Sequence, residues 1–212
     1  DLVNMLPAIS NSDATPLVRV PWNEPYEIMK ALDAGAYGVI VPMVNNRKEA
    51  EQAVMACRYP PLGNRSFGPI RGALYGGRGY AQEANDQIAC IAMIETAEGI
   101  TNADEIMSTS GLNGIYIGPA DLALSMGLPA MGDQPQDEHL VVVKELLEKC
   151  RAQKIAAGIH THRALSMRRS TLPSGLTLSP LAPIQVIWRK TRLVNLLPRE
   201  ARQKQNVRAL AI

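Results

Sequence analysis

The sequence predicts an α/β fold in which helices cover a parallel β-sheet. Short apolar runs alternate along the chain with amphipathic segments of helical period, which is the cadence of repeated strand–helix units. These runs are apolar on both faces, as expected for strands that are buried on both sides of a sheet. Five runs have this character, at residues 16–20, 37–41, 88–94, 114–117 and 155–159.

The first strand–helix unit follows a polar stretch at residues 11–15. Residues 16–20 are the strand, and Asn23 is expected to cap the helix that follows, because asparagine is a favoured N-cap. Pro25 falls in the first turn of that helix, where a proline is tolerated. The helix is expected to end at Gly35.

Three further helices are predicted between the later strands, at residues 48–57, 101–107 and 140–153. The last has the clearest period, and its inward-facing residues are expected to be Val141, Leu146, Leu147 and Cys150. The helix at 48–57 ends before a Tyr-Pro-Pro string, because the residue before a proline disfavours helical geometry.

Residues 62–86 are rich in glycine and show no strong apolar period. A connection this long is more often functional than idle, so we expect a loop over the open face of the sheet. Arg65 and Arg71 lie in it. We interpret both as solvated loop charges, the alternative being that they bind a distal carboxylate or phosphate of a substrate.

Composition excludes several classes of protein. The chain has 212 residues, enough for one domain with a sizeable core. No apolar run is long enough to cross a membrane, and the first residues lack the basic segment of a signal peptide. The three cysteines are odd in number and widely spaced, which predicts reduced packing residues in a cytoplasmic protein rather than disulfides or a zinc site.

Charge is distributed unevenly along the chain. Residues 1–162 carry 12 Lys and Arg against 19 Asp and Glu, whereas residues 163–212 carry 10 against 1. A basic tail is typical of nucleic-acid or membrane-surface binding. No aromatic residues are interleaved with these charges in the pattern of a nucleic-acid site, so we expect neither a nucleic-acid nor a membrane partner.

Two acidic residues follow neighbouring strands, Glu95 after the run at 88–94 and Asp121 after the run at 114–117. The carboxyl ends of parallel strands meet at one edge of a sheet, where α/β barrels build their sites. Carboxylate oxygens are the ligands that hard divalent cations prefer. Arg19, inside a strand, adds a charge that needs an anionic partner. Together they predict an enzyme that handles a small carboxylate on a metal.

Each of these residues also has a purely structural interpretation. Glu95 alone fits a surface or capping residue, Asp121 fits the N-cap of a helix that begins at Leu122, and Arg19 fits a structural ion pair. Their joint occurrence favours a site. His160 and His162 follow a strand at the same end, and we assign them no functional role; His139 has no metal-ligand partner at a useful spacing.

The chain resembles the HpcH/HpaI aldolase family, in the pyruvate-dependent branch that cleaves 2-keto-3-deoxy sugar acids and 4-hydroxy-2-oxo acids. The resemblance covers residues 1–161 and implies a (β/α)8 TIM barrel whose third to seventh strands are the five above. Its strings, in order, are VRVPW at 18–22, GVIVPMV at 38–44, RYPPLGNRSFGP at 58–69, IETAEG at 94–99 and GPADL at 118–122.

The resemblance implies roles for individual residues. Glu95 and Asp121 match the ligands of a divalent cation (Mg²⁺, Mn²⁺ or Co²⁺), which leaves open positions for pyruvate and stabilises its enolate when the carbon–carbon bond breaks. Arg19 matches the arginine near the keto oxygen. The backbone amides around Gly118, Pro119 and Ala120 would hold the pyruvate carboxylate where Asp121 opens a helix.

The chain departs from the family pattern at both ends. The family begins with two βα units before the equivalent of Asp1, and the second carries the histidine that is the usual catalytic base; nothing in residues 1–15 replaces it. After residue 161 the family continues to an eighth strand of the type GFDFVTLGSD. Here residues 162–212 are a non-family tail rich in Pro, Leu and Arg.

A shifted reading frame explains this tail. With ordinary codon choices, residues 173–182 can be decoded one base out of frame as xFGFDLVTLS, and residues 183–188 as TDTGYL. Our hypothesis is that a single-nucleotide slip near residue 162 has put the tail out of frame and removed the eighth strand. It predicts an incomplete barrel, and coding DNA that does not permit this decoding would exclude it.

The expected function is that of a class II (divalent-metal) aldehyde-lyase. The parent enzyme would split a 2-oxo-4-hydroxy acid reversibly into pyruvate and an aldehyde, and the 212-residue chain itself would release little pyruvate. The alternatives are a CoA-thioester lyase of the citrate lyase β or malyl-CoA type, and a non-catalytic remnant. The resemblance also implies a hexameric homo-oligomer with exchanged C-terminal helices.

Overall fold

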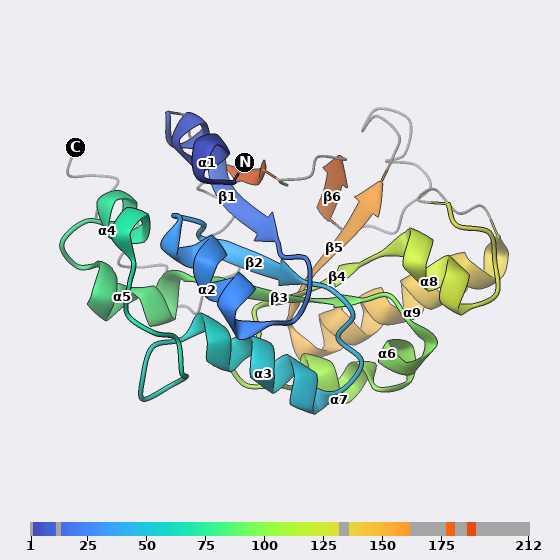
Figure 1. Cartoon of the computed structure of the whole chain (residues 1–212). Helices are drawn as coiled ribbons and strands as arrows, with labels where there is room; N and C mark the ends of the chain where they lie inside the picture. Colours follow the sequence, from blue (N-terminus) through green and yellow to red (C-terminus); the bar gives the residue numbers. More distant parts are fainter. Residues whose placement is uncertain (1, 12–13, 132–135, 162–176, 181–185, 190–212) are drawn as a thin grey trace.

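The computed structural model describes residues 2–11, 14–131, 136–161, 177–180 and 186–189. Its centre is a sheet with the strand order β6-β5-β4-β3-β2-β1-β7, so that strands β1 to β5 are neighbours in chain order (Figure 1). All pairs from β1 to β6 are parallel. The strands are β1 (Ala14–Arg19), β2 (Gly38–Val41), β3 (Ala89–Ile94), β4 (Gly114–Ile117), β5 (Ala156–Thr161), β6 (Thr177–Pro180) and β7 (Val186–Arg189).

Helices connect the strands, as the alternating pattern predicts. They are α1 (Leu2–Ser10), α2 (Pro25–Asp33), α3 (Arg47–Cys57), α4 (Ile70–Gly76), α5 (Tyr80–Gln87), α6 (Ala97–Thr101), α7 (Ala103–Met107), α8 (Pro119–Ser125) and α9 (Asp137–Gln153). The result is a parallel α/β half-barrel in which the five strands expected from the sequence lie at the expected positions. None of the helices in the described ranges is long and apolar enough to cross a membrane.

Two groups of buried apolar side chains occupy the two faces of the sheet. The larger group lies between the sheet and its helices and includes Ile28, Val54, Ile94 and Leu146. The smaller group comes from alternate strand positions: Leu17, Ile40, Ala89, Ile91, Met93 and Tyr116. Because side chains alternate across a strand, this second group marks the inner face of the half-barrel. Residues that continue this alternation at the carboxyl ends of the strands also face the inside of the half-barrel.

Several helix boundaries differ from the sequence expectation. Asn23 is not the cap of α2: Glu24 occupies the N-cap without a side-chain bond, and the Asn23 amide instead donates to the Glu49 carbonyl. The expected helix at 101–107 is two short helices, α6 and α7, that meet at Asn102. Val141 is 49% exposed rather than inward, because it lies on the solvent side of α9.

The glycine-rich segment at 62–86 is not a single loop. It contains α4 and α5, which follow α3 and precede β3. These helices lie near the amino ends of the strands, because Tyr37, which directly precedes β2, donates its hydroxyl hydrogen to the Tyr75 carbonyl of α4. Gly35, with φ of +109°, allows this approach, since a Cβ there would lie 2.4 Å from the Tyr75 ring. The segment therefore lies away from the carboxyl end.

The two outer strands come from the tail. Strand β6 pairs in parallel with β5. A parallel strand therefore follows β5 in the sheet, at the position of the eighth strand that the sequence predicts to be lost. Strand β7 pairs antiparallel with β1, unlike any pair in an all-parallel barrel. The shifted reading frame concerns the coding DNA and stays a prediction, as does a boundary at residue 161.

Candidate active site

Alternation along the strands brings three predicted site residues to one end of the inner face. Glu95 follows Ile91 and Met93 in the inward register of β3, and Arg19 follows Leu17 in that of β1. Gly118 follows Tyr116 in the register of β4. Each lies where its strand ends, so a carboxylate, a guanidinium and an exposed backbone segment face the same region.

Glu95 is buried and only partly satisfied. Its side chain is 1% exposed, and its Oε1 accepts a hydrogen bond of 2.8 Å from the Met43 backbone N–H. Its Oε2 is buried with no hydrogen-bond partner among the described residues. A buried carboxylate oxygen without a donor is costly, and such atoms call for an explanation. A cation at Oε2 would supply one.

Gly118 allows Glu95 to occupy this position. A Cβ on Gly118 would lie 2.3 Å from Glu95 Oε2 and 2.9 Å from the Met93 methyl carbon. Real Cβ atoms do not approach other atoms so closely, so any larger residue at 118 would displace the carboxylate. The glycine in the GPADL string is therefore required by packing against Glu95.

The loop between β2 and α3 holds Glu95 from the other side. Met43 has a φ of +55°, a left-handed conformation that is uncommon for a residue other than glycine, and its N–H donates to Glu95. Thr96 donates its hydroxyl hydrogen to Asn45 Oδ1, and Asn102 donates to the Asn45 carbonyl. These bonds join the loop to the start of α6 and position the donor for the carboxylate.

Asp121 lies in the first turn of α8 and is exposed. Gly118 is the N-cap of this helix and provides no side-chain cap. The Gly118 N–H donates to the Ile94 carbonyl at 3.4 Å, and Pro119 has no N–H. Three residues are expected to bind a carboxylate through their backbone amides. Of these, Ala120 alone has an N–H that does not donate to a carbonyl of any described strand, and Asp121 directly follows it.

Electrostatics couple the three charged residues. Burial raises the pKa of Glu95, and the neighbouring Asp121 carboxylate also raises it. The Met43 N–H and the positive charge of Arg19 act in the opposite direction, the former more strongly. Two carboxylates this close repel one another unless a shared proton or a cation lies between them. Arg19 is exposed, and among the described residues it forms no ion pair.

Comparison with known proteins places this chain in a family. The sequence model of the HpcH/HpaI aldolase/citrate lyase family matches residues 1–176. The chain belongs to this family. Its family resemblance is confirmed, and the fold agrees with it.

Curated relatives in the HpcH/HpaI family are aldolases by name. The hydroxypyruvate/pyruvate aldolase of Rhizorhabdus wittichii is 45% identical over 155 residues, which cover 73% of this chain and 62% of that protein. The 4-hydroxy-2-oxo-heptane-1,7-dioate aldolase of Escherichia coli strain ATCC 8739 is 37% identical over 161 residues, or 74% of this chain and 61% of that protein. The chain thus spans about three fifths of the length of these relatives.

Solved structures agree with the fold. A family protein from Burkholderia cenocepacia J2315 superposes with a TM-score of 0.74 at 31% identity, covering 98% of this chain and 79% of that one. The citrate synthase SbnG superposes with a TM-score of 0.68 at 27% identity, covering 99% and 76%. A protein named as an aldolase/citrate lyase family protein and one named as a citrate synthase therefore share this architecture.

The donor set at Glu95 and Asp121 fits a divalent cation. Both residues offer carboxylate oxygens, and Glu95 Oε2 is a buried acceptor without a donor. Within the described residues, no group of three or more His, Cys, Asp and Glu side chains gathers at one point. A site with two protein ligands is typical of Mg²⁺, which keeps several waters and binds the rest of its shell to substrate.

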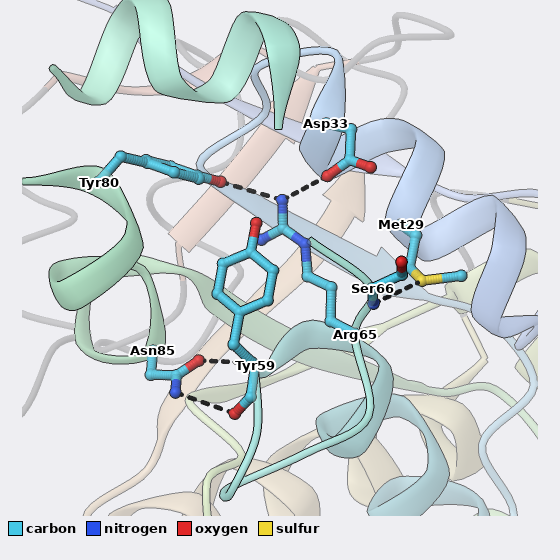
Figure 2. Close-up of polar contacts among 7 residues, drawn as sticks. All are labelled: Met29, Asp33, Tyr59, Arg65, Ser66, Tyr80 and Asn85. Atoms are coloured by element: carbon cyan, nitrogen blue, oxygen red, sulfur yellow. Dashed lines mark hydrogen bonds and ion pairs between the residues drawn. The ribbon is translucent and has the colours of Figure 1, made fainter. Parts of the chain in front are cut away.

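The interpretation of Arg65 as a solvated charge is wrong. Its side chain is fully buried, with Nη2 2.7 Å from Asp33 Oδ1 and 3.0 Å from the Tyr80 hydroxyl oxygen (Figure 2). The guanidinium carbon also lies 4.5 Å from the centre of the Tyr59 ring. This cluster is at the amino end of the sheet, beside α4 and α5, and therefore away from Glu95. Arg71 is half-buried and donates to the Tyr75 hydroxyl.

The histidines behave differently from one another. His160 contacts Tyr116 on the inner face, with a ring-centre distance of 6.4 Å and a hydroxyl-to-Nδ1 distance of 3.4 Å. His162 lies outside the described residues. His139 is buried and contacts the Pro119 carbonyl, a neighbour of the candidate site that sequence analysis missed. No spacing in the sequence links residues 119 and 139, so no local signal revealed the contact.

Proposed function

We propose that this chain carries the metal and pyruvate site of a class II aldolase. The enzyme would cleave a 2-oxo-4-hydroxy acid reversibly into pyruvate and an aldehyde. One observation carries the proposal: a buried glutamate oxygen without a donor faces Gly118, next to Asp121, in a family whose relatives are named as aldolases. Because the chain spans about three fifths of those relatives, the activity of the whole protein is part of the proposal.

Glu95 and Asp121 would hold the divalent cation, which we propose to be Mg²⁺, Mn²⁺ or Co²⁺. When bound, such a cation acts as a Lewis acid toward a keto oxygen. Glu95 is held for this task by the Met43 N–H, which fixes Oε1 and leaves Oε2 facing the site. Gly118 provides the space that Oε2 needs.

The remaining groups would orient pyruvate and stabilise charge. Arg19, at the end of β1, is exposed on the inner face and would place its positive charge beside the oxygen that becomes negative during cleavage. The Ala120 N–H, at the uncapped start of α8, would hold the carboxylate. Both groups lie on regular elements, which limits the reorganisation needed to bind the developing charge.

The wider setting is proposed on the same basis. The substrates would be a small 2-oxo acid and an aldehyde from aromatic-compound or sugar-acid catabolism, without a nucleic-acid or membrane partner. We also propose a homo-oligomer, a hexamer as in the resemblance, and a cytoplasmic location, which the three free buried cysteines support.

Metal-dependent pyruvate binding tests the proposal. Mn²⁺ binding by the 212-residue chain is measured through water-proton relaxation, and pyruvate is then titrated into the loaded protein. We expect saturable binding of both. Gly118→Ala should weaken pyruvate binding at least about tenfold, because its Cβ displaces Glu95.

Gly68→Ala is the matched control. Its Cβ would lie 3.7 Å from Asp33 Oδ2 in otherwise open space, so binding should equal that of the parent. If the parent binds neither Mn²⁺ nor pyruvate, the non-catalytic interpretation replaces the proposal. If acetyl-CoA binds and pyruvate does not, the CoA-thioester lyase replaces it.

A further inference from the structure

His139 joins the first turn of α8 to the long helix α9. The imidazole is 2% exposed, and its Nε2 lies 3.1 Å from the backbone carbonyl oxygen of Pro119. Pro119 directly precedes Ala120 and Asp121, the amide and the carboxylate of the candidate site. His139 lies outside the motifs that carry the family resemblance, and it contacts the GPADL segment across twenty residues of chain.

The partner of Nε2 fixes the tautomer of His139. A carbonyl oxygen only accepts, so Nε2 carries the hydrogen and donates it. Nδ1 is buried without a partner among the described residues, which suits the neutral ring. Burial also lowers the pKa of His139, so the ring is neutral near pH 7. The bond is therefore a neutral donor–acceptor pair in a dry environment, where such bonds are strong and their loss costly.

The two helices joined by this bond differ in how firmly they are held. Helix α9 has 17 residues and packs into the core through Val143, Leu146, Leu147 and Cys150. Helix α8 has seven residues and no side-chain cap, and Asp121 on it is exposed. A short uncapped helix frays readily. The buried hydrogen bond from His139 of α9 to Pro119, the first residue of α8, therefore restrains the turn at which α8 begins.

We propose that His139 is a positioning residue that holds the turn at residues 118–121 in the geometry that binds the pyruvate carboxylate. The inference rests on the proposed function for its ligand. His139 does not contact that ligand. It acts through the Pro119 carbonyl, whose fixed direction sets the direction of the Ala120 N–H and of the Asp121 side chain.

Three variants test the proposal. His139→Leu removes the donor and fills the volume with an apolar side chain. His139→Gln keeps an N–H donor near the position of Nε2. Cys150→Ala is the control: it removes a buried side chain from the same helix, next to Met107 and away from α8. Circular dichroism confirms that each variant is folded before comparison.

The first measurement is amide hydrogen exchange of the metal-free chain. We expect His139→Leu to speed exchange of the α8 amides about tenfold, the effect of one lost buried hydrogen bond, with α9 unchanged. His139→Gln should restore protection to within about threefold of the parent. Cys150→Ala should leave α8 protection unchanged, because the amides of this short helix exchange through local opening, to which the cavity beside Met107 does not contribute. Equal α8 exchange in parent and His139→Leu would overturn the inference, whatever the chain binds.

The second measurement is the Kd of pyruvate for the Mn²⁺-loaded chain. His139→Leu should raise this Kd about tenfold while the Kd of Mn²⁺ alone changes less than about twofold, because the turn binds the carboxylate rather than the cation. His139→Gln should restore it. If His139→Leu changes α8 exchange but the parent does not bind pyruvate, the proposed function is refuted and the His139–Pro119 bond remains only a restraint on α8. If His139→Leu binds pyruvate as the parent does, the positioning role of His139 is refuted.

Discussion

At the scale of single residues, Glu95 shows a conflict between stability and chemistry. Its carboxylate is buried with one donor, the Met43 N–H, while its second oxygen has none. Desolvation disfavours its charged form and raises its pKa. A protein selected for stability alone would place a neutral group here. The persistence of an acid is the behaviour expected of a ligand that a cation completes.

Glu95→Gln should therefore stabilise the metal-free chain by about 1–2 kcal/mol at pH 7, because the amide oxygen still accepts from Met43 and no charge is buried. The same change should abolish stabilisation by Mn²⁺ with pyruvate. Urea unfolding with and without Mn²⁺ measures both effects. Glu51→Gln, on the exposed face of α3, is the control and should change stability by less than about 0.5 kcal/mol.

The gain in Glu95→Gln should depend on pH. The folded-state pKa of Glu95 is raised above the ordinary value of 4.5, so the folded chain binds its proton more tightly than the unfolded chain. The parent therefore loses unfolding free energy as the pH rises from 4.5 through the raised pKa of Glu95. Below pH 4.5 the parent and Glu95→Gln should have the same unfolding free energy. If the difference in unfolding free energy between the two proteins stays constant across this pH range, ionisation of Glu95 does not cause it.

The chemistry-bearing residues were visible in the sequence because they follow apolar strands. Glu95 and Asp121 stand out as acids at the ends of buried runs, and their roles as ligands stay predictions. The groups that support them were not visible. Met43 acts through its backbone N–H and a left-handed φ, and His139 acts across twenty residues of chain. Backbone donors and long-range contacts have no sequence signature of their own.

At the scale of elements, an ion pair between the fully buried Arg65 and the partly exposed Asp33 attaches the segment before α4, and through Tyr80 also α5, to α2. Asp33, in the last turn of α2, pairs with Arg65, which also donates to Tyr80 of α5 (Figure 2). Arg65 Nε and Nη1 are buried without partners among the described residues. Asp33 is the anion that compensates this guanidinium, so its loss would leave a buried, unpaired charge.

Asp33→Ala should cost about 3 kcal/mol of unfolding free energy, since removal of its carboxylate leaves the charge of the fully buried Arg65 guanidinium without a partner. Asp33→Asn, which keeps an acceptor, should cost less. Glu148→Ala breaks an exposed pair with Arg151 and is the control, with an expected cost below about 0.5 kcal/mol. Urea unfolding of the three variants measures this. A cost for Asp33→Ala no larger than that of the control would show that water reaches Arg65.

The accuracy of sequence-based prediction differed between strands and helices for a physical reason. The five central strands are predominantly apolar, and burial on both faces makes such runs conspicuous. Helices α4 and α5 were missed because glycines and polar residues obscure their period. The contact of Tyr80, the first residue of α5, with the buried Arg65 becomes visible only after folding, because the two residues are fifteen apart in sequence.

At the scale of the whole molecule, one apolar core connects the elements that support the site. The buried group between sheet and helices includes residues of α2, α3, β2, β3, β4, α8 and α9. Glu95 follows a strand of this core, and the turn at residues 118–121 is tied to a helix of it. We therefore expect Glu95, the strands and the core helices of the half-barrel to unfold together rather than in parts, apart from local fraying of α8.

The cysteines report on that cooperativity. Cys57 on α3, Cys90 on β3 and Cys150 on α9 are each at most 1% exposed. Burial raises the pKa of Cys150 to about 12. The hydrogen bond between Cys57 and Cys90, together with burial, raises the pKa of Cys90, whereas the same hydrogen bond lowers the pKa of Cys57. Only thiolates attack disulfide reagents rapidly, and buried thiols must first become accessible. In the native chain all three should react with Ellman's reagent at least about 1,000-fold more slowly than a free thiol.

Across a urea series at pH 8, the three thiols should become reactive with one shared midpoint, because they belong to one core and its loss exposes them together. Peptide mass spectrometry assigns the label to each cysteine. Cys150→Ala is the control: it should shift the shared midpoint of Cys57 and Cys90 downward without separating them, since the cavity weakens the whole core. Labelling of Cys150 at much lower urea than Cys57 would instead mean that α9 opens by itself. In that case the helix that carries His139 would not be rigid, and the Glu95 contacts alone would have to maintain the geometry at residues 118–121.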